Sequence, residues 1–423
     1  MAIEDDVLVV GGGLAGVASA LAAAGTGASV RVVSHKESTL RQASGLIDVL
    51  GYPPGDGGEG PVVDPFDALA DLPGSHPYSL VGESALRRGL AAFDDAVGDA
   101  YRGGHTDRNA LVATFGGTVK PTARYPAGVA PGLASDDAPA LLVGFETRVD
   151  FDAPLAADHL AAAGVPFDVA GVTVAFPGGF RPDATVTRLA RALDEDESVG
   201  GAGARAALAD AVAPHVGSRE RVGFPAVLGL DRPGAVRADL ADRLGAAVFE
   251  VPTGPPSLPG MRLSARLDDA LDAAGVRVSS GAPVVDREAD GGRVERVFVD
   301  REGRRVPFAA DQYVLATGGL VGGGVESDRE SATEPVFGCH VPAPDDRYDW
   351  FGDAPFGDHP FARFGVDAGP DLRPRDAAGE VRFDNLRAAG GVLGGFDFAS
   401  ECSGSGVSLA TGHAAGTAAG ANA

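Results

Sequence analysis

Three glycines near the N-terminus have the spacing of a phosphate-binding turn. Gly11, Gly13 and Gly16 fit the pattern G-x-G-x-x-G. The first glycine of this pattern permits a tight turn, the second lets the backbone approach a pyrophosphate, and the third lets a helix pack closely on a strand. Around Leu14 and Ala15, the first turn of that helix offers free N–H groups and partial positive charge to a phosphate. The pattern therefore predicts the phosphate site of a nucleotide cofactor.

The elements beside this turn have the required order. Residues 7–10 are a short apolar run, typical of a buried parallel strand, and residues 14–24 are small, apolar and free of proline, which favours a helix. Residues 29–33 indicate a second strand, so a strand–helix–strand unit is predicted. An acidic residue usually ends that strand and holds a ribose hydroxyl, but Ser34 stands there. The usual adenosine anchor is therefore absent, which leaves room for a shorter nucleotide such as FMN.

Later glycine-rich segments indicate that the nucleotide is a flavin. Residues 312–315 read as a strand that runs into Ala316, Thr317 and Gly318, after two hairpin-like segments. In flavoproteins with two dinucleotide-binding domains, such a turn lies against the cofactor. Each glycine cluster alone is more often a plain turn. Three such clusters in this order along the chain, at residues 11–16, 316–319 and 389–392, favour a flavin site.

Further candidates for flavin contact lie at the ends of predicted elements. Gly391 ends a strand, and Gly404 and Gly406 precede the last helix. We expect the N-terminus of that helix to face the flavin pyrimidine, where it stabilises the negative charge of a reduced flavin near N1. Ser44 and Gly45 follow the second strand, where flavoproteins of this type bring backbone near the flavin ring. The alternative for these two residues is a helix cap.

The charge of the chain describes its solvent more than its ligand. The 423 residues carry a formal net charge of −24, and lysine occurs only at positions 36 and 120. Such a chain repels nucleic acid and anionic lipid, so neither is expected as a direct partner. A surface rich in aspartate and poor in lysine is typical of extreme halophiles, because dense carboxylates stay hydrated in concentrated salt.

The chain lacks the residues for an electron-transfer metal site and for its own membrane anchor. Its cysteines are Cys339 and Cys402, whereas zinc sites and iron–sulfur clusters need about four ligands. The acidic N-terminus lacks the basic start of a signal peptide, and no apolar run reaches the length of a membrane span. We therefore expect no metal and a cytoplasmic protein that reaches the inner face of a membrane only through a partner.

The domain organisation follows from two candidate boundaries. Residues 51–60 form a glycine- and proline-rich loop, and residues 252–259 form a second such linker. The predicted fold is α/β, a three-layer Rossmann-like FAD/NAD(P)-binding fold with a central parallel sheet and an inserted α+β cap or substrate domain. The flavin domain is discontinuous, and the predicted segments are 1–50, 260–325 and 380–423 for it, 51–259 for the cap, and 326–379 for an irregular loop.

The sequence as a whole resembles the B subunits of the anaerobic glycerol-3-phosphate dehydrogenases. The resemblance runs from end to end of the chain, and the segments that carry it are residues 11–16, 44–50, 259–263, 316–319 and 390–397. It implies an FMN-dependent flavoprotein, with FAD as the alternative, that oxidises sn-glycerol 3-phosphate to dihydroxyacetone phosphate in glycerol metabolism and anaerobic respiration. It also implies two partners in one complex, the A subunit, which bears FAD, and the C subunit, which holds iron–sulfur clusters and passes electrons to membrane quinone. With the composition, it indicates a halophilic archaeon.

Candidates for the chemical step come from what the oxidation of a phosphorylated alcohol requires. A base must take the hydroxyl proton, and arginine or lysine must bind the phosphate. Lys120 and Arg124 lie close together in sequence, and His340 lies about twenty residues beyond the turn at 316–319. The alternatives are a solvated loop for the first pair and a surface or core histidine for the third residue.

Three functions remain open from the residues. The first is a catalytic dehydrogenase subunit. The second is a non-catalytic flavin-bearing subunit for electron transfer or assembly. The third is an unrelated FAD-dependent reductase that uses NAD(P)H, although no second complete glycine fingerprint occurs in the middle of the chain.

Overall fold

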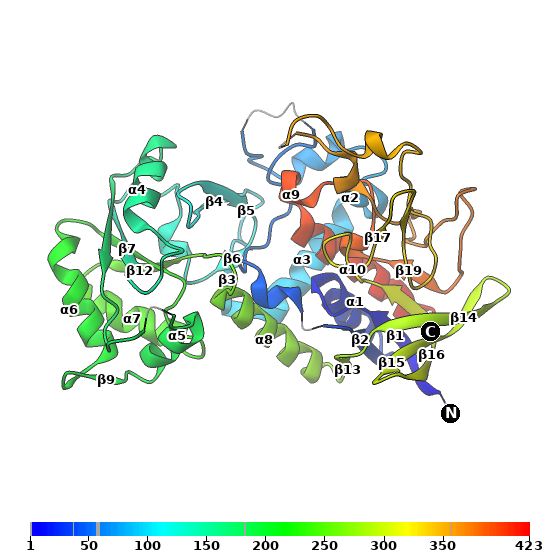
Figure 1. Cartoon of the computed structure of the whole chain (residues 1–423), viewed down its shortest axis with the longest axis horizontal. Coiled ribbons are helices and arrows are strands. Elements are labelled where there is room, and N and C mark those ends of the chain that lie inside the picture. Colours follow the sequence, from blue (N-terminus) through cyan, green and yellow to red (C-terminus); the bar gives the residue numbers. More distant parts are fainter. Residues whose placement is uncertain (1, 37, 56–59, 182, 356) are drawn as a thin grey trace. The chain divides into compact units, whose positions relative to one another are not determined.

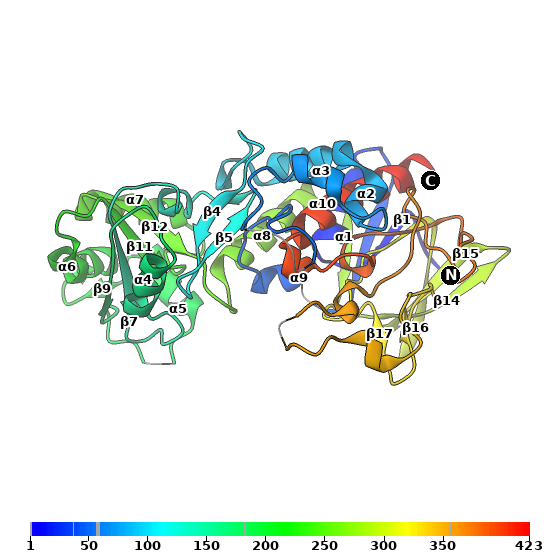
Figure 2. The same cartoon turned by 90° about the horizontal axis from the view of Figure 1, so that it is seen from above.

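The computed structural model describes residues 2–36, 38–55, 60–181, 183–355 and 357–423. The chain divides into two compact units, a first unit of residues 1–39, 48–98 and 266–423 and a second unit of residues 40–47 and 99–265. Each unit has its own main sheet and its own covering helices (Figures 1 and 2).

Seven strands among the described residues form the sheet of the first unit. These strands are β1 (Ile3–Val10), β2 (Val30–Ser34), β13 (Arg277–Ser280), β14 (Val284–Asp290), β15 (Arg293–Arg301), β16 (Arg304–Leu315) and β19 (Leu386–Ala388). β1 lies between β2 and β16 and is parallel to both, β13 is parallel to β2, and β19 is parallel to the end of β16. β15 is antiparallel to both β14 and β16. The expected Rossmann-like α/β fold is confirmed, and the two hairpins extend its parallel part into a mixed sheet.

Glycines let the helices of the first unit pack at close range. These helices are α1 (Leu14–Ala24), α2 (Pro77–Val81), α3 (Glu83–Val97), α9 (Phe398–Glu401), α10 (Gly404–Ala421) and the second half of α8 (Leu258–Ala273). α1 and α10 lie side by side, and a Cβ on Gly412 would come within 2.6 Å of the Ala15 carbonyl oxygen (Figures 1 and 2). α3 packs on α10 in the same way, since a Cβ on Gly89 would lie 2.5 Å from the Leu409 carbonyl oxygen. Glycine at these contacts removes the atoms that would separate the helices.

The division of the chain differs from the predicted boundaries. Residues 48–98, which we expected in the cap from position 51 onward, belong to the first unit because they contain α3. Residues 40–47 and 260–265 belong to the second unit. The predicted irregular stretch 326–379 contains the short pair β17 (Glu326–Ser327) and β18 (Ala332–Thr333) and two 3-10 turns. Glycine- and proline-rich loops mark chain reversals, and a reversal need not coincide with a domain boundary.

The second unit is built on a four-stranded sheet in the order β12-β11-β7-β8, and all neighbouring strands are parallel. The strands of this sheet are β7 (Ala140–Phe145), β8 (Val169–Val174), β11 (Arg221–Pro225) and β12 (Ala247–Val251). Its helices are α4 (Ala153–Ala162), α5 (Val186–Asp194), α6 (Ala204–Val216), α7 (Pro233–Leu244) and the first half of α8. Three antiparallel pairs accompany it, namely β3 (Tyr101–Arg102) with β6 (Tyr125–Pro126), β4 (Ala110–Ala113) with β5 (Val119–Thr122), and β9 (Ser198–Val199) with β10 (Ala202–Gly203).

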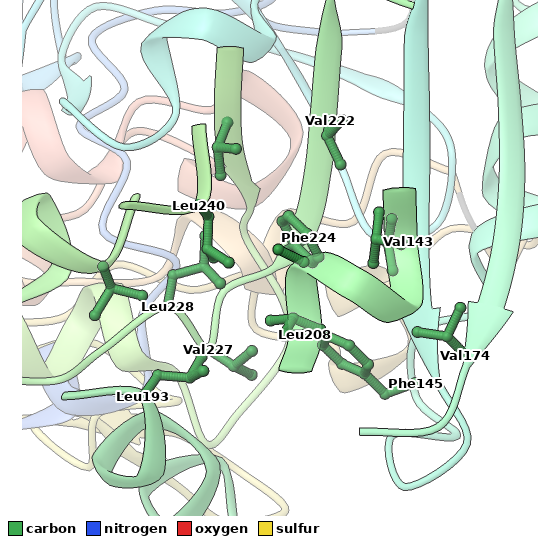
Figure 3. Packing of buried hydrophobic residues seen from close by; sticks show 14 of the residues in the cluster. Val143, Phe145, Val174, Leu193, Leu208, Val222, Phe224, Val227, Leu228 and Leu240 are labelled. Atoms are coloured by element: carbon green, nitrogen blue, oxygen red, sulfur yellow. The ribbon is translucent and has the colours of Figure 1, made fainter. Parts of the chain in front are cut away.

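Helices cover both faces of this sheet. Val143 and Phe145 of β7 pack with residues of α5, α6 and α7, as the cluster in Figure 3 shows, whereas Leu142 faces a second cluster built on α4. The unit is therefore an α/β layer structure, where we expected an α+β cap. Strands that alternate with helices along the chain must return in the same direction, so their sheet is parallel.

Candidate functional site

A cavity of about 470 Å³ opens in the first unit where its parallel strands end. Its lining comes from the carboxyl ends of β1, β2 and β16 and from residues 283–285, which follow β13. Ligands of open α/β sheets bind at this edge. The glycine turn and the turn at 316–318 both line the cavity, so the structure brings together two of the predicted cofactor segments.

The three glycines of the first turn have different neighbours. Gly11 has φ +119°, and a Cβ there would lie 2.1 Å from the Ala316 carbonyl oxygen. A Cβ on Gly16 would lie 1.9 Å from the Gly11 carbonyl oxygen. Gly13, in contrast, has no neighbour within 4 Å of that position. The protein's own packing requires the first and third glycines, and the second leaves space at the start of α1 for a ligand.

The start of α1 offers hydrogen-bond donors at this space. Gly13 is the N-cap of α1 and supplies no side-chain hydrogen bond. The N–H groups of Leu14 and Ala15, in the first helical turn, have no acceptor within the helix. Together with the helix dipole, they form a site for a phosphate oxygen.

Two side chains of the cavity have free hydrogen-bonding capacity. Thr317 lines the cavity, and its hydroxyl oxygen is buried without a hydrogen-bond partner in the described residues. The Ser34 hydroxyl, at the end of β2, donates to the Lys36 carbonyl oxygen at 2.6 Å and can still accept a hydrogen bond from a ligand. A polar ligand in the cavity would satisfy the buried threonine oxygen, so these residues fit a nucleotide.

A buried carboxylate shapes another wall of the cavity. Glu334 is 1% exposed, and its side chain accepts hydrogen bonds from the N–H groups of Val336 and Phe337 at 2.8 and 2.7 Å. Burial raises the pKa of Glu334, and these backbone hydrogen bonds oppose the shift. Because Pro335 and Val336 line the cavity, Glu334 holds this part of its wall in place.

The glycines predicted near the flavin ring lie outside the lining of this cavity. A Cβ on Gly391 would be 3.4 Å from the Gly319 backbone nitrogen, next to the turn at 316–318. Gly406 packs against Tyr78, whose hydroxyl oxygen would lie 2.1 Å from a Cβ there, and Gly404 packs against Phe398. Their contacts in the structure are with protein atoms, and their contact with a flavin stays a prediction.

The remaining predicted site residues are divided between the two units. Ser44, Gly45, Lys120 and Arg124 belong to the second unit, and His340 belongs to the first. The carbonyl oxygen of His340 accepts a hydrogen bond from the Asp367 N–H at 3.2 Å. The structure therefore does not place the three catalytic candidates within one compact unit.

Within the second unit, the segment of Ser44 and Gly45 meets that of Arg124. The Arg124 N–H donates to the Ile47 carbonyl oxygen at 3.0 Å, and the Ile47 N–H donates to the Arg124 carbonyl oxygen at 2.8 Å. The Tyr101 hydroxyl donates to the Gly45 carbonyl oxygen at 2.7 Å. Lys120 lies on β5, opposite Val112 on β4.

Sequence reasoning missed the side of the cavity formed by Lys36, Thr39 and residues 283–285. The available signal was the alternation of Val276, Arg277 and Val278, which is typical of a short strand. A strand placed beside β2 in a parallel sheet must end at the same edge as β2, so the residues that follow it line the same pocket.

Comparison with known proteins identifies relatives along the whole chain. A family model described as an FAD binding domain matches residues 6–407. The probable B subunit of an anaerobic glycerol-3-phosphate dehydrogenase from Halobacterium salinarum is 62% identical over 423 residues, which cover 99% of this chain and 98% of that protein. The B subunit of the anaerobic glycerol-3-phosphate dehydrogenase from Pectobacterium atrosepticum is 32% identical, and the match covers 96% of both chains. A solved flavocytochrome c3 fumarate reductase aligns over 99% of this chain and 78% of its own, with 11% identity and a TM-score of 0.43, a likeness too weak to add weight.

Proposed function

Because the chain belongs to the family of anaerobic glycerol-3-phosphate dehydrogenase B subunits, we propose that it oxidises sn-glycerol 3-phosphate to dihydroxyacetone phosphate with a bound flavin. The observation that carries this proposal is the cavity at the carboxyl ends of β1, β2 and β16, where Gly13 leaves open space beside the donors of α1. The acidic, lysine-poor composition agrees with the relative from Halobacterium salinarum.

We propose FAD as the flavin. Ser34 at the end of β2 led us to expect FMN, because the usual acidic ribose anchor is absent. The cavity, however, continues from the glycine turn past Ser34 to Pro283 and Val285, which is the adenosine side of a dinucleotide site. The Ser34 hydroxyl can accept a hydrogen bond from a ribose hydroxyl. The family model that spans the chain is also one for FAD.

The chain's own residues supply binding and proton transfer. A bound flavin supplies an acceptor for the hydride of a secondary alcohol. We assign His340 as the base that takes the hydroxyl proton, because histidine is the side chain that most often acts as a general base. We assign Lys120 and Arg124 to the substrate, where a guanidinium pairs with phosphate oxygens.

We propose that the chain works in a complex that carries its electrons onward. Among the described residues, no helix has the length and apolar character that a membrane span requires. Cys339 and Cys402 are too few to hold an iron–sulfur cluster. The FAD-bearing A subunit of the complex, together with its iron–sulfur C subunit, would pass the electrons to membrane quinone and hold this cytoplasmic chain at the inner face of the membrane.

Two measurements on the purified full chain test the proposal. Denaturation should release FAD; release of FMN would refute the choice of FAD, and release of no flavin would refute the flavin site. Anaerobic addition of sn-glycerol 3-phosphate should bleach the bound flavin, and glycerol should not. If bleaching occurs only when the FAD-bearing partner is present, this chain serves electron transfer alone, and the catalytic assignment is wrong.

A further inference from the structure

Arginine side chains gather around the short β3–β6 pair of the second unit. Arg102 on β3 lies directly opposite Tyr125 on β6, and Arg124 precedes Tyr125 in the chain. The Arg102 guanidinium donates to the carbonyl oxygens of Asp99 and Tyr101 at 2.7 and 2.8 Å. Arg102 forms no ion pair with any described residue. Its positive charge is therefore held by neutral carbonyl groups beside Tyr125.

A second pair of arginines reaches the same place from α7 and α8. Glu250 of β12 is 1% exposed and pairs with Arg262 at 2.6 and 3.0 Å. The Glu250 N–H donates to the Gly128 carbonyl oxygen at 2.9 Å, just beyond β6. The Arg237 side chain lies against Gly128 too, with its Nε 3.4 Å from the position of a Cβ there. One buried carboxylate thus stands beside Arg262 and Arg237.

Arg237 is the least satisfied member of this group. Its Nε is buried without a hydrogen-bond acceptor, and it forms no ion pair within the described part of the chain. Burial lowers the pKa of Arg237, Glu250 raises it, and the charges of Arg262 and Arg102 lower it further. Arg237 and Arg262 both lie beside Glu250, so their positive charges repel each other. A guanidinium stays charged even so, and an anion would relieve the repulsion.

Tyr125 adds a neutral donor to this positive group. The residue is 5% exposed and lies opposite Arg102 in the β3–β6 pair. Burial raises the pKa of Tyr125, and the charges of Arg102 and Arg124 oppose the shift. The phenol is therefore protonated near neutral pH and can donate a hydrogen bond to an anion.

The group lies at the edge of the sheet where a ligand is expected. In the order β12-β11-β7-β8, β8 follows β7 on one side and β11 and β12 lie on the other, so the winding reverses between β7 and β11. Doubly wound sheets bind ligands outside the carboxyl ends of their strands. Glu250 lies one residue before the end of β12, and its Oε1 accepts a hydrogen bond from the Leu228 N–H, three residues beyond β11.

We propose that Arg102, Arg124, Arg237 and Tyr125 form the site for the phosphate group of the substrate. The inference rests on the proposed function and gives it a named phosphate subsite. A phosphate monoester carries close to two negative charges at neutral pH and has three acceptor oxygens, which match guanidinium and phenol donors. In a chain of net charge −24, such a positive group selects glycerol 3-phosphate over uncharged glycerol.

The test uses the full chain with its flavin bound and inorganic phosphate as the probe. Calorimetry compares the wild type with Arg237→Gln and Arg102→Gln, all at one potassium chloride concentration. A hydrogen bond to a charged group is worth enough to expect a rise of about 10- to 100-fold in the phosphate Kd of each variant. Arg191→Gln is the matched control, because Arg191 is an exposed arginine of the same unit, on α5, and should leave the Kd unchanged.

Flavin reduction by sn-glycerol 3-phosphate separates this inference from the proposed function. The phosphate group does not react, so the two variants should raise KM more than they lower kcat. If the wild type binds phosphate but does not reduce its flavin, and the variants lose phosphate binding, the subsite is supported and the catalytic assignment is refuted. Flavin reduction with unchanged KM and Kd in both variants overturns the subsite, as does a wild type that binds no phosphate. Because Arg102 is exposed, its variant keeps the test valid if Arg237→Gln fails to fold.

Discussion

Replacement of Gly13 by alanine should weaken flavin binding and leave the fold intact. Gly13 has φ −78° and ψ −176°, a conformation open to alanine, and a Cβ there meets no protein atom within 4 Å. Alanine is a poorer N-cap than glycine by about 0.5–1 kcal/mol. It also lowers the conformational entropy of the unfolded chain, which stabilises the folded state by a similar free energy. We therefore expect the free energy of unfolding to change by less than about 0.5 kcal/mol.

The same methyl group enters the space in which the backbone must approach a diphosphate. Crowding of a close contact by one carbon costs about 1–3 kcal/mol, which corresponds to about 5- to 150-fold weaker binding. The assay is titration of the apoprotein with FAD, followed by the quenching of flavin fluorescence, alongside a guanidinium chloride unfolding curve.

Gly16→Ala is the informative comparison for this experiment. Its Cβ would lie 1.9 Å from the Gly11 carbonyl oxygen, so the turn itself must move. This variant should lose about 1–3 kcal/mol of stability together with its flavin. The reasoning is refuted if Gly13→Ala binds FAD as tightly as the wild type, or if it loses as much stability as Gly16→Ala.

Three further substitutions test the packing and electrostatics of each unit. Phe224→Ala empties a site that is 0% exposed in the core of the second unit, and should lower the free energy of unfolding by about 3–5 kcal/mol; a loss under about 1 kcal/mol would contradict this packing. Glu250→Gln leaves the Arg262 charge uncompensated and should cost about 3–5 kcal/mol in chemical unfolding, and the added Arg262→Met should recover part of that loss. Burial and the charge of Arg88 lower the pKa of His413 below 6.5, so the folded state resists its protonation and loses stability as pH falls through that value. The fall in Tm between about pH 7.5 and pH 5.5 should be smaller in His413→Gln, and an equal fall in both proteins would show that His413 is not responsible.

Local pattern was sufficient to predict the elements around the glycine turn. The predicted helix 14–24 coincides with α1, and the predicted strands at 7–10 and 29–33 overlap β1 and β2. These elements follow from short-range physics, since apolar runs, glycines and the absence of proline act within a few residues. The roles of Gly11 and Gly16 in packing were also predictable from the sequence, because a tight turn between strand and helix allows only glycine at those positions.

The membership of each unit could not be predicted in the same way. Residues 48–98 belong with the first unit because Gly89 of α3 meets the backbone of Leu409 on α10, more than 300 residues away. The second unit was expected as α+β, and its sheet is parallel because its strands alternate with helices that cover both faces. The first outcome depends on which surfaces meet, and the composition of a loop carries no record of that.

The sequence by itself predicted a phosphate site at the backbone of Gly13 and identified an acidic chain of the flavoprotein type. It also supplies two cysteines, whereas an iron–sulfur cluster needs about four ligands. Only the tertiary structure decided what surrounds that turn. The order of parallel strands brings Pro283 and Ser34 to the lining of one cavity, on the side where we propose the adenosine of FAD. It likewise puts Arg102 and Arg237 in one group with Tyr125. Charge and hydrogen-bonding capacity belong to each residue, but their sum at one point depends on the pairing of distant strands, which no local pattern encodes.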